Sequence, residues 1–389
     1  MSKITYVTLV NKQYEPYLDQ LIRSHQTFSR IDLTVYTINF DAKKSNYGNI
    51  KFIEFYDGNL LEFEERGNNK FINSEYEKHK YTTLLKTKVL KRISVSYDYY
   101  FFVDADILLT KNSDALVINT INEFGYIKFP VSVQFYHYYS TSHGPEEPTF
   151  YESGEFNPKS LGYYPLIDLY KTEFHNVPYL TTYCIYYTRE CLDFLEEAEK
   201  ICFDKNVIAD YKKYLPLGDE TVFNYLYSKY NFSGFISSYL CYDISPFLEI
   251  SDALKNIEKA KNFISFIHTK RCFIPLENQK MFSNIRNEEY DQILNSLTSE
   301  ENIDSKINIF SCVDENDITI VTFSLNENYE GNFKISLVSL FRPDKEYTYF
   351  IDLCDGVNFF VIKERDVHIK DFHLLIENNR IIKDLIRLT

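Results

Sequence analysis

Apolar and polar positions along the first hundred residues predict strands separated by helices. Residues 4–10 form a short, β-rich apolar run that ends at Asn11. The segment after it carries apolar residues at helical spacing, namely Tyr17, Leu18, Leu21 and Ile22. Further strands are expected at 31–39, ending at Asp41, and at 51–55. Strands that alternate with helices are typical of a parallel sheet, so the pattern predicts an α/β fold.

The next helix and strand lead to a pair of acidic residues. A helix is expected over 75–96, where apolar residues recur at spacings of three and four and lysines, among them Lys86, fill much of the rest. The run Tyr-Tyr-Phe-Phe-Val at 99–103 predicts a buried central strand, and Asp104 and Asp106 follow it. Ligands of open α/β sheets bind beyond the carboxyl ends of the strands. A phosphate-bearing ligand could therefore meet these acids and nearby lysines.

The middle of the chain departs from this alternation. Residues 134–178 are rich in Tyr, His, Pro, Gly and Glu, so long loops over the sheet are expected there. Long loops in compact domains often carry functional residues. A strand is expected again at 179–187, followed by a helix at 189–203.

Two later elements bring further candidate side chains. Leu-Gly-Asp-Glu at 217–220 predicts a turn and a helix start, where Asp219 and Glu220 suit the positive end of the helix dipole. A strand over 262–268 ends in His268. Each also has a purely structural explanation, as a helix cap or as a hydrogen-bonded structural histidine. A chemical role therefore depends on what lies beside them.

The pattern changes near residue 300. A polar stretch there, Thr-Ser-Glu-Glu-Asn-Ile-Asp-Ser-Lys, is typical of a linker. Short alternating strands separated by turn residues are expected at 307–311, 316–324, 332–341, 346–353, 357–363 and 366–375. They predict a small antiparallel sandwich. We therefore expect a domain over 1–300 and a β-rich accessory domain over 305–389, the latter suited to oligomer contacts or to a lid.

Composition and charge narrow the classes of partner. The chain of 389 residues has 34 Tyr, 32 Phe and no Trp, which a genome rich in A and T explains, although some tyrosines can still line a sugar site. The formal net charge of −14 disfavours a nucleic-acid partner and general attraction to anionic membranes. A local basic cleft remains compatible with that charge.

Cysteines and terminal sequence bear on the compartment. The seven cysteines are scattered, without a C-x-x-C pair, which disfavours a zinc site or a disulfide framework and fits buried thiols in a reducing compartment. The chain begins with a strand pattern and not with a signal-peptide pattern. No segment approaches eighteen uncharged apolar residues, so no transmembrane helix is expected. A cytoplasmic location is the simplest expectation.

Asp-x-Asp at the end of a strand suggests metal chemistry. Two carboxylates supply the hard oxygen ligands that Mg²⁺ or Mn²⁺ prefers, and such an ion keeps positions free for phosphate oxygens. It then neutralises the charge that develops on a departing diphosphate. The strand before Asp104 and the apolar run after Asp106 strengthen this interpretation over that of two solvated turn residues.

Residues 101–109, Phe-Phe-Val-Asp-Ala-Asp-Ile-Leu-Leu, resemble the metal-binding segment of GT-A fold glycosyltransferases. The likeness is closest to the glycogenin and bacterial galactosyltransferase type of family eight, and extends over about residues 1–275. It implies Mn²⁺ or Mg²⁺ held by Asp104, Asp106 and His268. It also implies a nucleotide-sugar donor, UDP-sugar first, and transfer to a glycan or another hydroxyl acceptor.

The same resemblance implies roles for the other candidates. The donor-binding candidates are Thr8, Val10, Asn11, Asp41, Lys86, Asp104, Ala105 and Lys270. Asp219 and Glu220 match the family's Asp-Gln-x-x-x-Asn helix start, with Glu220 in place of Gln, and would act near the transferred sugar as a general base or as a stabilising group. Residues 182–184, Thr-Tyr-Cys, stand where the family usually has Asn-x-Gly. The resemblance favours retention of configuration.

Other functions stay open at this point. A nucleotidyltransferase would combine paired acids, metal and nucleotide, but the loop after the first strand lacks the glycines such enzymes often carry. A carbohydrate-binding protein or an inactive relative is a second alternative, which the predicted C-terminal sandwich favours because such modules often bind glycans. The acceptor can be a surface glycan, a protein hydroxyl, a lipid-linked sugar or a modified nucleobase. The aromatic residues of 134–178 favour a sugar or another stackable acceptor.

Overall fold

The computed structural model describes most of the first 236 residues and selected segments after them. Described are residues 3–42, 48–93, 96–134, 159, 161–177, 179–236, 241–243, 251, 254, 257, 264–269, 271–273, 281–283 and 287–298, and seven strands between 307 and 387. The chain forms two compact units, Met1–Cys241 with Phe266–Thr269, and Tyr242–Ser265 with Lys270–Thr389. The expected division at 300–305 stays a prediction.

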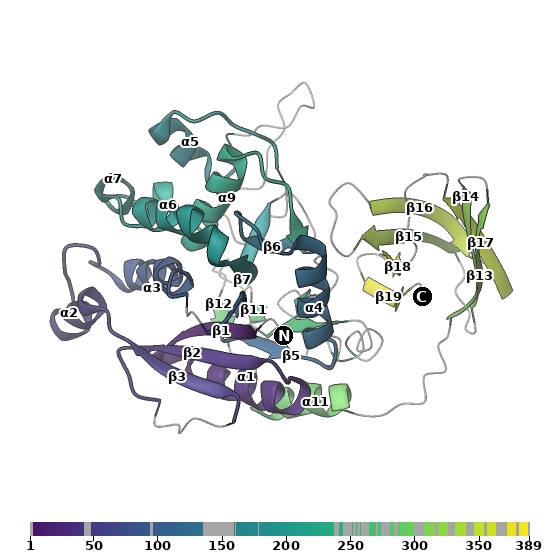
Figure 1. Cartoon of the computed structure of the whole chain (residues 1–389), viewed down its shortest axis with the longest axis horizontal. Helices are drawn as coiled ribbons and strands as arrows, with labels where there is room; N and C mark the ends of the chain where they lie inside the picture. Colours follow the sequence, from purple (N-terminus) through teal and green to yellow (C-terminus); the bar gives the residue numbers. More distant parts are fainter. Residues whose placement is uncertain are drawn as a thin grey trace. The chain divides into compact units, whose positions relative to one another are not determined.

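A seven-stranded, mostly parallel sheet is the centre of the first unit (Figure 1). Its spatial order is β3-β2-β1-β4-β7-β6-β8. In chain order the strands are β1 (Ile4–Asn11), β2 (Asp32–Ile38), β3 (Ile50–Phe55), β4 (Tyr99–Val103), β6 (Val131–Gln134), β7 (Leu180–Thr188) and β8 (Phe235–Ile236). β1 to β4 run parallel, and β7 is antiparallel to both β4 and β6. The predicted α/β fold is confirmed.

Helices alternate with these strands as the periodicity predicts. They are η1 (Lys12–Tyr14), α1 (Glu15–Phe28), α2 (Gly58–Arg66), α3 (Glu75–Leu90), α4 (Ser113–Phe124), α5 (Tyr164–Tyr170), η3 (Arg189–Cys191), α6 (Leu192–Cys202), α7 (Lys205–Ile208), α8 (Tyr211–Tyr214), α9 (Asp219–Lys229) and α11 (Asn287–Thr298). Ser74 caps α3 by accepting from the backbone N–H of Glu77, and Asp57 caps α2 in the same way. Among the described residues, none of the helices is both long and apolar enough to cross a membrane.

Different helices cover the two faces of the sheet. Successive residues of a strand point to opposite faces. Tyr6 of β1 makes an edge-to-face contact with His25 of α1, with ring centroids 6.2 Å apart. Its neighbour Val7 belongs instead to the hydrophobic core that contains Leu84 of α3. α6 and α9 pack together with α3 on that second face (Figure 1).

A short antiparallel pair continues from the end of β4. β5 (Ile107–Leu109) pairs with β10 (Phe266–His268), and His268 lies opposite Ile107. This pairing connects the segment after the two acids to a strand about 160 residues later. The predicted strand end at His268 is therefore beside the predicted metal-binding acids.

Several predicted boundaries were wrong. α3 ends at Leu90 and not at 96. α5 occupies part of 134–178, where only loops were expected, because Pro165 at its start suits the first turn of a helix as well as a loop. Residues 135–158, which include most of the predicted aromatic loops, lie outside the described residues.

The second unit contains antiparallel strands. They form a sheet of β13 (Ile307–Glu315), β14 (Ile318–Leu325) and β17 (Gly356–Ile362), and a sheet of β16 (Glu346–Leu353), β15 (Gly331–Ser339), β18 (Phe372–Asn378) and β19 (Ile381–Arg387). Its shorter strands β11 (Arg271–Phe273) and β12 (Met281–Ser283) pair with each other, while β9 (Cys241–Asp243) begins in the first unit. The predicted antiparallel pattern is confirmed. Of the last predicted strand, 366–375, residues 372–375 belong to β18 and residues 366–371 lie outside the described residues. β19 was missed.

Asn224 of α9 fixes this helix to β7. Its Nδ2 donates to the backbone oxygens of Leu180, at 2.8 Å, and Glu220, at 2.9 Å, while its Oδ1 accepts from the backbone N–H of Leu180 at 2.9 Å. Asn224 is 1% exposed, so water cannot replace these bonds. The side chain thus sets the position of the helix that begins with Asp219.

We expect Asn224→Ala to lower the melting temperature of the protein. The substitution leaves the buried N–H and C=O of Leu180 without their partners, at a cost of about 2–4 kcal/mol, or roughly 5–10 °C. Thermal unfolding followed by circular dichroism measures this. Asn206→Ala, at an exposed position of α7, is the control and should change little. Equal melting temperatures for both variants would contradict the anchoring role.

Candidate metal and donor site

Neighbouring segments on both sides hold the turn that carries the two acids. The backbone N–H of Asp104 donates to the carbonyl of Tyr183 in β7 at 2.8 Å. The carbonyl of Asp106 accepts from both the N–H of Thr269, at 2.9 Å, and its hydroxyl, at 2.8 Å. Ile107 N–H closes the turn onto the carbonyl of Asp104 at 3.1 Å. These hydrogen bonds therefore fix the backbone from which both carboxylates project.

Lys86 of α3 lies between two of the acids. Its Nζ is 3.0 Å from Oδ1 of Asp104 and 3.1 Å from Oδ2 of Asp219, and donates to the carbonyl of Thr182 at 2.8 Å. Burial by itself would lower the pKa of Lys86, but the two carboxylates outweigh it and raise the pKa above its usual value. Lys86 is therefore charged. The sequence suggested a contact with donor phosphates, whereas the structure pairs Lys86 with the acids.

Asp106 and His268 form the most direct candidate for metal binding. Oδ2 of Asp106 and Nε2 of His268 are 3.7 Å apart, and the residues are 6% and 9% exposed. An oxygen and an imidazole nitrogen in this arrangement suit Mn²⁺. Burial and the charges of Asp106 and Asp219 raise the pKa of Asp104, against the opposing effect of Lys86. A cation near these carboxylates would therefore relieve their mutual repulsion.

The donor set fits a divalent cation in its chemistry but is not a preformed cage. In the described part of the chain, no three His, Cys, Asp or Glu side chains stand close enough together to hold a metal. At Asp104, Oδ1 is paired with Nζ of Lys86 at 3.0 Å. Asp106 and His268 would hold the ion, with Asp104 as the third ligand that the sequence resemblance implies.

Tyr183 is a residue of this site that the sequence did not single out. Its ring is stacked on the imidazole of His268, with centroids 5.1 Å apart and planes 5° from parallel. The only sequence signal for Tyr183 is that residues 182–184 are Thr-Tyr-Cys where the family usually has Asn-x-Gly. The ring contact itself joins β7 to β10, which no local pattern predicts.

Asp219 and Glu220 begin α9 and differ in their surroundings. Asp219 is 3% exposed and is paired with Lys86. Burial, and then the charge of Asp219, raise the pKa of Glu220 from 4.5 to about 7, although a hydrogen bond with Tyr179 and the charge of Lys86 oppose this. Glu220 can therefore gain or lose a proton near neutral pH, while Asp219 serves to balance Lys86.

The predicted nucleotide-binding residues of the first two strands are Thr8, Val10, Asn11 and Asp41. Val7 is the last residue of β1 paired with β4, opposite Phe102. The following residues of β1 therefore run past the point where β4 ends in Asp104. Thr8 is buried, and its hydroxyl has no hydrogen-bond partner among the described residues. The side chain of Asn11 accepts from the backbone N–H of Tyr14, as a turn residue does, and Asp41 is exposed.

Two further donor-binding candidates have different outcomes. Ala105 lies between the acids and is 4% exposed, so only its backbone is available to a ligand. Lys270 lies outside the described residues. The donor roles of both residues stay predictions.

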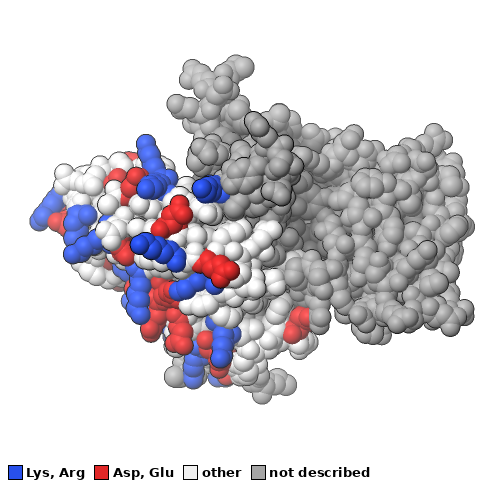
Figure 2. Space-filling view, turned by 90° about the horizontal axis from the view of Figure 1, so that it is seen from above, with Lys and Arg blue, Asp and Glu red and all other residues white. Residues whose placement is uncertain are grey.

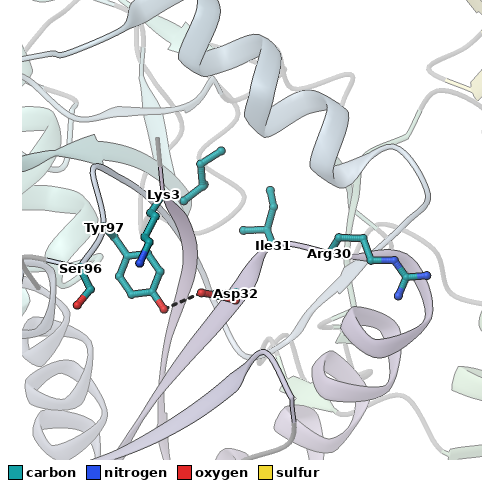
Figure 3. Close-up of a pocket in the computed structure, with 7 residues that line it drawn as sticks. Lys3, Arg30, Ile31, Asp32, Ser96 and Tyr97 are labelled. Atoms are coloured by element: carbon teal, nitrogen blue, oxygen red, sulfur yellow. Dashed lines mark hydrogen bonds between the residues drawn. The ribbon is translucent and has the colours of Figure 1, made fainter. Parts of the chain in front are cut away.

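A cavity of about 320 Å³ occurs at the other end of the sheet (Figure 3). Lys3, Asp32 and Tyr97 line it at or next to the starts of β1, β2 and β4. The hydroxyl of Tyr97 donates to Oδ2 of Asp32 at 2.8 Å. Among the predicted site residues that the structure describes, none lines this cavity. It is therefore separate from the acids, which follow the carboxyl end of β4.

Comparison with known proteins finds likeness in structure only. No protein-family model and no curated protein sequence matches the chain. The galactosyltransferase LgtC, solved with donor and acceptor sugar analogues, is 12% identical over 77% of this chain and 98% of its own, with a TM-score of 0.43. The bifunctional glycosyltransferase WbbM is 14% identical over 76% and 50%, at 0.46, and mouse xyloside xylosyltransferase 1 is 8% identical over 71% and 99%, at 0.40. These values are low, so function must be inferred from this chain's own residues.

Gly218 allows α9 to approach α3 so closely. Its φ of +66° and ψ of −128° belong to a region that favours glycine. A Cβ added there would lie 2.1 Å from Oγ1 and 3.2 Å from Cβ of Thr83, one turn before Lys86 on α3. The absence of a side chain at Gly218 thus brings Asp219 to Lys86.

We expect Gly218→Ala to destabilise the protein more than Gly125→Ala. Gly125 has nearly the same backbone angles, φ +57° and ψ −137°, but open space at its Cβ. Both variants incur backbone strain of about 1–3 kcal/mol, and only Gly218→Ala adds the clash with Thr83, about 1–3 kcal/mol more. Melting temperatures measure the difference. Adding Thr83→Ala should bring Gly218→Ala close to Gly125→Ala, and equal losses in the two single variants would disprove the close approach.

Proposed function

We propose that this chain is a metal-dependent glycosyltransferase that moves a sugar from a nucleotide-sugar, UDP-sugar first, to a hydroxyl acceptor such as a glycan. One observation supports it most. Two acids follow the central strand β4, and the second, Asp106, lies 3.7 Å from the imidazole of His268. Lys86 and Glu220 complete the set of charged groups that such a transfer requires.

The residues divide the work as follows. A bound Mn²⁺ or Mg²⁺ would neutralise charge on the departing diphosphate. The bond between the sugar's anomeric carbon and the diphosphate oxygen breaks, and a bond from that carbon to the acceptor oxygen forms. Of the two roles that the resemblance leaves open for Glu220, we assign it that of general base: it takes the proton that the acceptor hydroxyl loses, because its pKa, raised to about 7, matches that task near neutral pH. Asp219 and Lys86 balance each other beside the reacting sugar.

One face of the molecule carries charges of both signs in the part that the structure describes. On the face drawn in Figure 2, basic and acidic side chains are interspersed over the coloured residues.

The cysteines whose side chains are described, Cys184, Cys191, Cys202 and Cys241, are free and buried. They fit the reducing environment expected from the sequence, and a cytoplasmic location is part of this proposal.

We expect Asp106→Ala to weaken the Mn²⁺-dependent binding of UDP. Titration calorimetry of the full chain with UDP, with and without Mn²⁺, measures this directly. The wild type should bind UDP only with Mn²⁺, and loss of the Asp106 carboxylate should weaken binding by about 100-fold, as loss of a metal ligand does.

Asp193→Ala is the matched control, because Asp193 is an exposed acid in the first turn of α6. It removes the same charge and should leave UDP binding unchanged. If UDP fails with the wild type, then GDP, CDP and dTDP test for another donor. Failure of all four nucleotides would refute the transferase and favour a glycan-binding protein.

The pH dependence of transfer should report Glu220. Because its pKa is raised to about 7, the carboxylate needed to accept a proton becomes populated as pH rises through about 7. We therefore expect kcat/KM to increase across this range and to level off above it. The groups that face Glu220 are Asp219 of its own helix, Tyr179 before β7 and Lys86 of α3.

Glu220→Gln removes the titration while keeping the size of the side chain. We expect its rate to fall by about 10²–10⁴ and its profile to lose the rise near pH 7. A pH–rate series with both proteins at a saturating metal concentration decides this. If Glu220→Gln kept the rate and the rise, another group would have to accept the proton.

A further inference from the structure

Tyr183 touches two parts of the candidate metal site at once. Its carbonyl accepts the hydrogen bond from the backbone N–H of Asp104 at 2.8 Å. Its ring is stacked on His268, with centroids 5.1 Å apart and planes 5° from parallel. One residue of β7 thus contacts the first acid through its backbone and the imidazole through its side chain.

The stack acts on the freedom that the backbone leaves to His268. Pairing with Ile107 of β5 fixes the backbone of His268 but does not fix the torsion angles of its side chain. A histidine ligand must aim one ring nitrogen along the metal bond, and the groups around the ring normally fix that aim. Offset stacking of two flat rings is favourable and orients the ring. Such a contact is therefore suited to hold the imidazole plane.

We propose that Tyr183 is a positioning residue that holds the imidazole of His268 in the orientation needed to bind a divalent cation. The proposal rests on the metal role assigned to Asp106 and His268 under the proposed function. The backbone bond to Asp104 survives any substitution of the side chain. Replacement of Tyr183 therefore removes the ring stack while this backbone bond stays in place.

β7 supplies a matched control. Tyr187 of the same strand stacks on Tyr100, with centroids 5.1 Å apart and planes 23° from parallel. This pair is near the far end of β7 from the acids, because Tyr187 lies opposite Tyr100 while Cys184 lies opposite Val103. Tyr187→Leu removes a stacked tyrosine from the same strand without touching His268.

The experiment is a titration of the full chain with Mn²⁺ alone, in which electron paramagnetic resonance measures the free ion. We expect Tyr183→Leu to raise the dissociation constant for Mn²⁺ by about 10-fold or more, as loss of a supporting contact to a metal ligand does. Tyr183→Phe keeps the ring and should bind Mn²⁺ as the wild type does. Tyr187→Leu should also bind as the wild type, even where its melting temperature falls.

Two reference variants, Asp106→Ala and His268→Ala, separate the possible failures. If both weaken Mn²⁺ binding and Tyr183→Leu does not, the positioning role is overturned and the metal site stands. An equal loss in Tyr187→Leu and Tyr183→Leu also overturns it, since general loosening of the strand would then be the cause. If neither reference variant changes Mn²⁺ binding, the metal site itself is wrong, and the role of Tyr183 is overturned with it.

Discussion

The pairing of the buried Lys86 ammonium with two carboxylates is the interaction on which the arrangement of the first unit depends. Moving a charged group out of water costs several kcal/mol unless it is paired and hydrogen-bonded. Lys86 meets both conditions through Asp104, Asp219 and the carbonyl of Thr182. These partners come from the end of β4, the start of α9 and from β7. The ion pairs therefore require three distant segments to meet at one place.

Uncharged contacts hold the start of α9 beside Lys86. Gly218 removes the side chain that would strike Thr83, and Asn224 hydrogen-bonds to both backbone groups of Leu180. The turn after β4 is likewise held by Tyr183 and Thr269. Repulsion among the acids is thus resisted by neutral contacts as well as by Lys86. Asp104 therefore stays close enough to Asp106 and Asp219 for their charges to act on it, and the proposed metal site depends on this repulsion.

Features could be predicted where the residues that form them are close together in the sequence. The apolar run of β4 and the acids after it are local, so the strand, the fold class and the place of Asp104 and Asp106 after that strand could be predicted. His268 could be proposed through a resemblance, but its position opposite Ile107 is a long-range pairing. The partnership of Lys86 with Asp219, the contact of Gly218 with Thr83 and the stack of Tyr183 on His268 depend on helices and strands meeting in space. Periodicity contains no information on such meetings.

The abundance of tyrosine shows why contacts, and not counts, identify a site. Most tyrosines of the described core have structural explanations. Tyr81, for example, is fully buried and its hydroxyl donates to Asp57, the cap of α2. The hydroxyl of Tyr6 likewise donates to Asp114. A large ring whose hydroxyl finds a partner can serve where other proteins use Trp or Leu. Tyr183 differs, because it contacts a candidate ligand of the metal, and this contact gives it a role in the site that the composition alone could not.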